Sequence, residues 1–179
     1  MNQTRARLLR AAAELVVETG WGGVSTRLVA QRAGVPGGAV HYHFTSVDAL
    51  LRESVAPALA ALTAGLRAGL AASPGPRDGV RLMIRAVTDG PADGPGAILI
   101  GEVFLRSTRD PVLRADVAAV LAALRADLAG WLAGHGLGDR AAPVATVLTA
   151  TLDALGLHRA LDPALDLTGV EDTLLELIR

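Results

Sequence analysis

The chain has 179 residues and a formal net charge of −1; 51% of its residues are hydrophobic and only 3% are aromatic. It contains no cysteine, which excludes a disulfide framework, a thiolate metal site and a thiol redox sensor. The length suffices for one large or two small domains, and the dominance of alanine and leucine predicts an all-α fold with an aliphatic core.

The N-terminal apolar stretch is interrupted by charges throughout, and we find no later run of about 18 uncharged apolar residues. We therefore expect a cytoplasmic protein that is neither exported nor inserted in a membrane. Up to Val55 there are six arginines against four acidic residues, and beyond it eleven against fourteen. The basic excess near the N-terminus suits contact with phosphates.

The first predicted helix covers residues 4–19 and ends at Gly20. A helix-turn-helix pattern follows over residues 24–44. Ser25 is placed to cap the first helix of this pattern, and Gly34 tolerates the left-handed backbone that ends it.

The second helix of the pattern is expected over residues 37–44, directly after Pro36, which suits a helix start. Val40 and Phe44 are four positions apart and share one inward face. The other sides of this short helix remain available for contact, which fits a helix that enters the major groove of DNA.

A long helix is predicted from just after Ser46, a plausible cap, to about residue 72. Pro57 lies inside this pattern and removes one helical hydrogen bond, so we expect a kink close to it. The sequence thus divides into two modules, residues 1–55 and residues 56–179.

Five further helices bring the predicted number to nine, separated by runs rich in glycine and proline. They are expected over residues 80–88, 97–107, 111–133, 140–160 and 168–178. The helix over residues 97–107 is apolar almost all round, which predicts deep burial.

Catalytic, cofactor and metal sites are not expected. His41 and His43 lie two positions apart, so on a helix they point about 200° apart and cannot share a metal ion. No nucleophile motif, phosphate-binding loop or dinucleotide fingerprint is present in the sequence. We therefore expect a protein that is not an enzyme and holds no cofactor.

The segment STRLVAQRAGV, the short helix ending in HYHF and the following TSVDALL together resemble the signature of the TetR family of bacterial transcription regulators. The closing stretch TATLDALGLHRALDPALDLTGVEDTLLELI agrees with the family with less specificity. The resemblance implies a nine-helix homodimer. It makes residues 1–55 the DNA-binding domain and residues 56–179 the ligand-binding and dimerisation domain.

The family's DNA contacts would fall on eight residues of the helix-turn-helix: Thr26, Arg27, Gly37, Gly38, Ala39, His41, Tyr42 and His43. Arg27 can grip a guanine edge or a phosphate with two hydrogen bonds, whereas Tyr42 and His43 can reach backbone oxygens. The alternative for the two glycines is that they only ease the turn.

Two departures from the family pattern weaken the expected grip on phosphates. His41 stands where a tyrosine is usual, and Thr45 and Val47 stand where lysines are common. Arg5 and Arg7 are candidates to compensate, with simple solvated charge as the alternative.

The resemblance also places a small-molecule cavity in the second domain. Its candidate lining residues are Leu62, Leu66, Met83, Val87, Ile98, Glu102, Phe104, Leu121 and Leu124. Most of them can equally be core, and Glu102 can either orient a ligand or form an internal ion pair or face solvent. The scarcity of aromatic residues favours a flexible aliphatic effector over a large cation.

The last two helices carry apolar stripes that a partner subunit would cover. The candidate interface residues are Leu148, Thr151, Leu152, Leu155, Leu174 and Ile178. The sequence therefore predicts a dimeric, ligand-responsive repressor released from a palindromic operator by a small apolar effector. The alternative is an all-helical small-molecule-binding protein or enzyme that keeps the helix-turn-helix only as scaffold.

Overall fold

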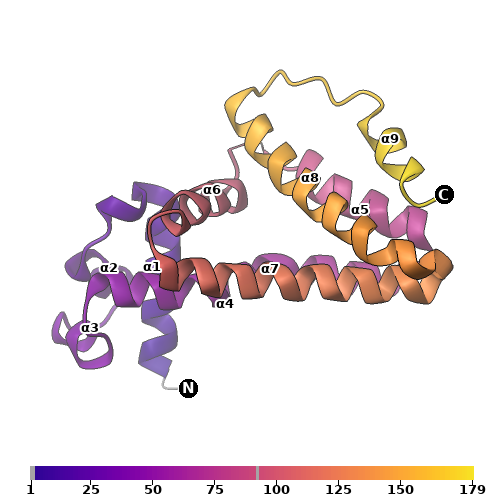
Figure 1. Cartoon of the computed structure of the whole chain (residues 1–179). Helices are drawn as coiled ribbons and strands as arrows, with labels where there is room; N and C mark the ends of the chain where they lie inside the picture. The colour runs from indigo at the N-terminus through magenta and orange to yellow at the C-terminus, as the bar shows by residue number, and fades with distance from the viewer. Residues whose placement is uncertain (1–2, 92) are drawn as a thin grey trace. The chain divides into compact units, whose positions relative to one another are not determined.

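The computed structural model describes residues 3–91 and 93–179, and all regular secondary structure in this part is helical (Figure 1). Nine α-helices and three short helical turns follow one another along the described chain, which confirms the predicted all-α class. The helices form two compact units. The first runs from the start of the described chain to Ala61 and includes Ile98–Ala118, and the second comprises Leu62–Ala97 and Ala119–Arg179.

The first unit contains the helix-turn-helix. It is built from α1 (Gln3–Thr19), the turn Trp21–Gly23, α2 (Thr26–Ala33), α3 (Gly38–His43), the start of α4 (Val47–Ala72), most of α6 (Pro95–Ser107) and the start of α7 (Pro111–Leu132). Its core is aliphatic and includes Leu8, Val29, Val40, Leu50 and Val55, all at most 2% exposed. Val40 and Phe44 are both buried, as their spacing predicts.

Helix starts in this unit follow short-range signals in the sequence. Ser46 Oγ accepts a hydrogen bond from the Ala49 backbone N–H at 3.0 Å at the start of α4. Asp110 Oδ1 accepts bonds from the N–H groups of Val112 and Leu113 at the start of α7. These bonds lower the pKa of Asp110, chiefly through the Leu113 N–H, and Arg52 adds an ion pair at 3.2 Å.

Two expectations differ from the structure. Helix α5 (Pro76–Thr88) begins four residues before the predicted start at residue 80, because Pro76 takes the first helical position, where a missing N–H costs nothing. Helix α6 is not buried all round: Leu99 and Val103 face the core, while Leu105 is 63% exposed. The apolar residues on all sides of α6 therefore wrongly predicted that the whole helix is buried.

The second unit packs α5 against α8 (Ala141–Leu161) and α9 (Val170–Glu176). Its core joins side chains from these three helices and from α4 and α7, among them Val80, Met83, Leu128, Leu148, Leu152, Leu174 and Leu175. Arg159 of α8 donates hydrogen bonds to the carbonyls of Val87 and Gly90 just where α5 ends. This contact ties the end of α5 to α8.

Two stretches are long and apolar enough to cross a membrane by length and composition alone: α4 and the segment from Pro111 to Leu161. Core helices of globular proteins pass the same test. The second stretch is not one continuous helix, because a turn over Ala133–Leu137 and Gly138–Arg140 separates α7 from α8. Gly136 in this turn has a φ of 94°, which favours glycine.

Candidate DNA-binding interface

The helix-turn-helix has the local geometry that its sequence predicts. Ser25 Oγ accepts a hydrogen bond from the Leu28 N–H at 3.3 Å and caps α2. Gly34 ends α2 in the left-handed region with φ 62° and ψ 44°. The N–H of Val35 then donates to the Ala30 carbonyl at 3.0 Å, so the chain turns sharply toward α3.

Arg7 of α1 holds this turn in place. Its Nη2 donates to the carbonyls of Ala33 and Gly34, the latter at 3.0 Å. Arg5 forms an ion pair with Glu53 and lies over the ring of Phe44, 5.0 Å from its centroid. Both arginines, expected as possible phosphate ligands, are therefore engaged in contacts within the unit.

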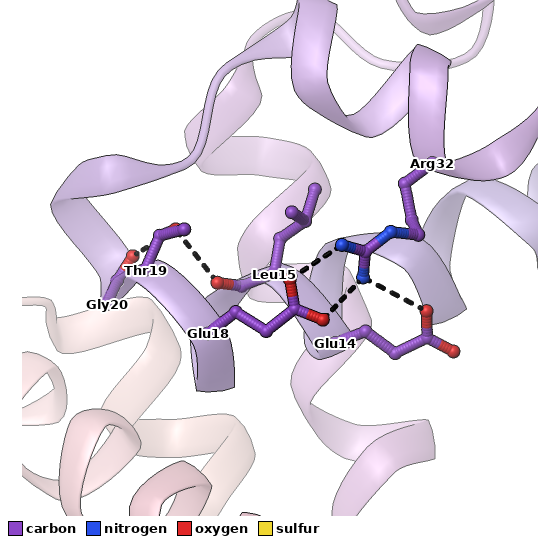
Figure 2. A network of polar contacts seen from close by, with 6 residues as sticks. All are labelled: Glu14, Leu15, Glu18, Thr19, Gly20 and Arg32. Atoms are coloured by element: carbon purple, nitrogen blue, oxygen red, sulfur yellow. Dashed lines mark hydrogen bonds and ion pairs between the residues drawn. The ribbon is translucent and has the colours of Figure 1, made fainter.

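A second arginine contact fastens α2 to α1 (Figure 2). The guanidinium of Arg32 donates two hydrogen bonds to the carboxylate of Glu18, at 2.7 and 2.6 Å, and lies 3.6 Å from Glu14. The hydrogen bond lowers the pKa of Glu18 and raises that of Arg32. The paired geometry fixes the orientation of α2, although the charges remain in contact with water.

The structure leaves most of the predicted DNA contacts uncovered. Arg27, Gly37, Gly38 and His41 are exposed, and Tyr42 is 84% exposed. The remaining three, Thr26, Ala39 and His43, are half-buried. The ring of His43 meets the ring of Tyr42 edge-on, with centroids 5.0 Å apart.

Four of these residues meet at an open hollow of about 470 Å³ between α2 and α3. Its lining comprises Thr26, Arg27, Ala30, Gln31, Val35, Gly37 and His41. Gln31 was not among the predicted contacts. The signal that could have found it is its position four residues after Arg27, which puts both side chains on one face of α2.

Glu102, a candidate ligand-binding residue, has a partner inside the first unit. Its Oε2 accepts a hydrogen bond from the backbone N–H of Trp21 at 2.9 Å. One turn further along α6, the guanidinium of Arg106 lies 5.7 Å from the Trp21 ring centroid and 3.7 Å from the carboxylate of Asp48. Helix α6 thus holds the turn between α1 and α2 at two points.

Replacing Glu102 with alanine is expected to lower the free energy of unfolding by about 1–3 kcal/mol, because the partly buried Trp21 N–H loses a charged acceptor. Denaturant unfolding measures this loss. The Glu102→Gln variant is the matched control, since its amide oxygen can still accept the bond and most of the stability should remain. Equal stability of the alanine variant and the wild type would contradict the assigned role of Glu102.

The other predicted ligand and interface residues are distributed over both units. Ile98 and Phe104 belong to the first unit, and Leu62, Leu66, Met83, Val87, Leu121 and Leu124 to the second. Four of the six candidate interface residues, Leu148, Leu152, Leu174 and Ile178, are buried within one chain. Thr151 and Leu155 are half-buried and remain accessible in part.

Comparison with known proteins and the geometry of the helix-turn-helix indicate the same class of protein, a DNA-binding regulator. Residues 8–54 match the profile of "Bacterial regulatory proteins, tetR family". A transcriptional regulator from Rhodococcus sp. Rha1 is 30% identical, with a TM-score of 0.71, and the match covers 97% of this chain and 93% of that one. No curated protein sequence matches the chain.

Two further solved structures share the fold over almost the whole chain. A transcriptional regulator from Streptomyces coelicolor A3(2) has 26% identity, a TM-score of 0.79 and coverage of 98% of both chains. FadR from Bacillus subtilis, solved in complex with stearoyl-CoA, has 19% identity, a TM-score of 0.73 and coverage of 97% and 96%. The protein is a helix-turn-helix regulator of transcription. It belongs to the TetR family of bacterial DNA-binding regulators.

Proposed function

We propose that this TetR-family protein is a cytoplasmic repressor that binds an operator as a homodimer and is released by a small apolar effector. The observation that supports operator binding is the uncovered surface of the helix-turn-helix, where Arg27 is exposed on α2, which Ser25 caps, and His41 and Tyr42 are exposed on α3. Eight residues form the proposed DNA contact: Thr26, Arg27, Gly37, Gly38, Ala39, His41, Tyr42 and His43. An electrophoretic shift of DNA from the region upstream of its own gene tests this proposal, and the absence of any shift contradicts it.

The proposed effector site uses the aliphatic side chains of the second unit. On α4, α5 and α7 these are Leu62, Leu66, Met83, Val87, Leu121 and Leu124, of which Leu62 is exposed and Leu66, Val87 and Leu121 are half-buried. Such side chains suit a flexible aliphatic ligand, and FadR from Bacillus subtilis offers a precedent in its stearoyl-CoA complex.

A thermal-shift screen tests the class of effector. Fatty acyl and polyketide-like compounds are expected to raise the melting temperature, because a ligand that binds only the folded state stabilises it. The same compounds should release the operator in a binding assay, as repression relieved by a ligand requires. Stabilisation by polar metabolites alone, with no response to any acyl compound, would reject an apolar effector.

The proposed dimer contact lies on the side of α8 away from the core of its own chain. Val147, Thr151 and Leu155 follow one another at intervals of four and so share a face of α8. Val147 is 46% exposed, and the other two are half-buried. Light scattering at micromolar concentration is expected to give the mass of two chains, and a monomer would contradict both the dimer and binding to a palindrome.

A lysine at the start of α4 should strengthen the grip on phosphates. Val47 opens α4 next to the DNA-binding surface, and the Val47→Lys variant adds a cation there. We expect tighter operator binding and a log–log salt slope steeper by about 0.9 for each added phosphate contact. A fluorescence-anisotropy salt series measures the slope, and an unchanged slope would show that residue 47 does not reach a phosphate.

A further inference from the structure

Helix α3, the second helix of the helix-turn-helix, begins with residues whose side chains cannot form hydrogen bonds with DNA bases. Gly37 and Gly38 carry none, and a Cβ placed on either glycine would meet nothing within 4 Å. Ala39, the next residue, offers only a methyl group. Sequence-specific hydrogen bonds in the major groove need donors or acceptors on side chains, so they must come from elsewhere on this surface.

Gly37, the first of the two glycines, lines the hollow between α2 and α3. Three polar side chains line this hollow from α2: Thr26, which is half-buried, and Arg27 and Gln31, which are exposed. Arg27 and Gln31 are four residues apart, which is about 6 Å along a helix and therefore between one and two base-pair steps. His41 of α3 lines the same hollow.

The arginines of the first unit differ in whether their side chains are bound to other residues of the protein. Four are occupied by partners within the first unit: Arg5, Arg7, Arg32 and Arg52. The side chain of Arg27 forms no hydrogen bond or ion pair with the residues that the structure describes, and neither does the side-chain amide of Gln31. These two side chains can therefore bind DNA without giving up an internal contact.

We propose that Gln31 reads a base of the operator, one helical turn along α2 from Arg27, and that these two side chains supply the readout that the glycine pair omits. This role rests on DNA binding by the helix-turn-helix. A glutamine amide donates and accepts at once, which matches the N6 amino group and N7 of adenine. Arg27 matches O6 and N7 of guanine. The operator half-site should therefore contain an adenine one or two base pairs from a guanine.

Selection of bound DNA from a random pool, run in parallel with four proteins, tests this role. The wild type is expected to enrich a sequence with the adenine, and the Gln31→Ala variant to lose the preference at that position alone. Gln31→Glu should prefer cytosine there, because a carboxylate only accepts and cytosine presents an N4 donor. Gln3→Ala, the same change at the exposed start of α1, is the matched control and should enrich the wild-type sequence.

Affinity measurements separate base readout from phosphate contact. On the wild-type sequence Gln31→Ala should bind about ten-fold more weakly, with an unchanged log–log salt slope. A slope lowered by about 0.9 for each lost contact would identify a phosphate contact instead and overturn the proposal. An unchanged base pattern for Gln31→Ala would overturn the role of Gln31 alone, whereas a wild type that enriches no sequence would overturn specific DNA binding itself.

Discussion

The double variant Arg27→Ala, Tyr42→Ala is expected to lose operator binding altogether while keeping the melting temperature of the wild type. Arg27 offers the guanidinium fork that grips a guanine edge or a phosphate, and Tyr42 offers a hydroxyl that fixes the register on the DNA backbone. Both side chains project from the surface, and Tyr42 is 84% exposed. Their removal therefore takes little from the core, and surface changes of this kind alter stability by only about 0.5 kcal/mol.

An electrophoretic shift assay and a thermal melt on the same preparations measure the two effects. Arg114→Ala provides the control, because Arg114 is exposed on α7, outside the helix-turn-helix. The control should shift DNA like the wild type. If the double variant still shifts the operator at wild-type concentrations, then α2 and α3 do not form the DNA contact. Such a result would favour the alternative in which the helix-turn-helix serves only as scaffold.

The Asp153→Asn variant is expected to stabilise the protein at neutral pH. Asp153 lies on α8, and burial raises the pKa of its carboxyl group to about 6, against the opposing influence of the Arg125 charge. The folded state therefore favours the protonated acid. Stability from this group is fully present below the unfolded pKa of 3.8 and is lost as the pH rises through 6.

Asparagine keeps the shape and removes the charge, so the gain in stability should be smallest at pH 4, increase as the pH rises through 6 and reach a plateau above pH 7. The rise in the pKa of Asp153 corresponds to about 3 kcal/mol in the free energy of unfolding. Partial hydration of the side chain reduces the expected gain to about 2 kcal/mol. Denaturant unfolding of both proteins from pH 4 to 8 measures the difference. Asp116→Asn, a change at an exposed position of α7, is the control. An equal gain at every pH would show that the charge of Asp153 is not its cause.

Local signals in the sequence predicted most of the helix-turn-helix. Ser25, Gly34 and Ser46 act through backbone groups within a few residues, so their roles follow from position alone. The buried face of α3 likewise follows from the spacing of Val40 and Phe44. Short-range chemistry and helical periodicity therefore suffice for this part of the fold.

Contacts between distant residues could not be predicted in the same way. Arg7 reaches the end of α2, and Glu102 reaches a backbone N–H 81 positions earlier in the chain. Either side chain could equally have faced solvent or a ligand on the evidence of sequence. In α8 both sides are rich in alanine, leucine and valine, so periodicity could not distinguish the side that packs on α5 from the accessible side that carries Val147.

The contact between Glu102 and Trp21 also bears on how this protein can be recombined with its relatives. The compact unit around the helix-turn-helix is discontinuous, since Ile98–Ala118 belongs to it although α5 intervenes in the chain. In a chimera that moves residues 1–55 alone to a relative, the bond to Trp21 would form only if the relative's α6 carries an acceptor at the place of Glu102. To move the operator preference to another TetR-family protein with this hydrogen bond intact, the N-terminal segment and α6 should be transferred together.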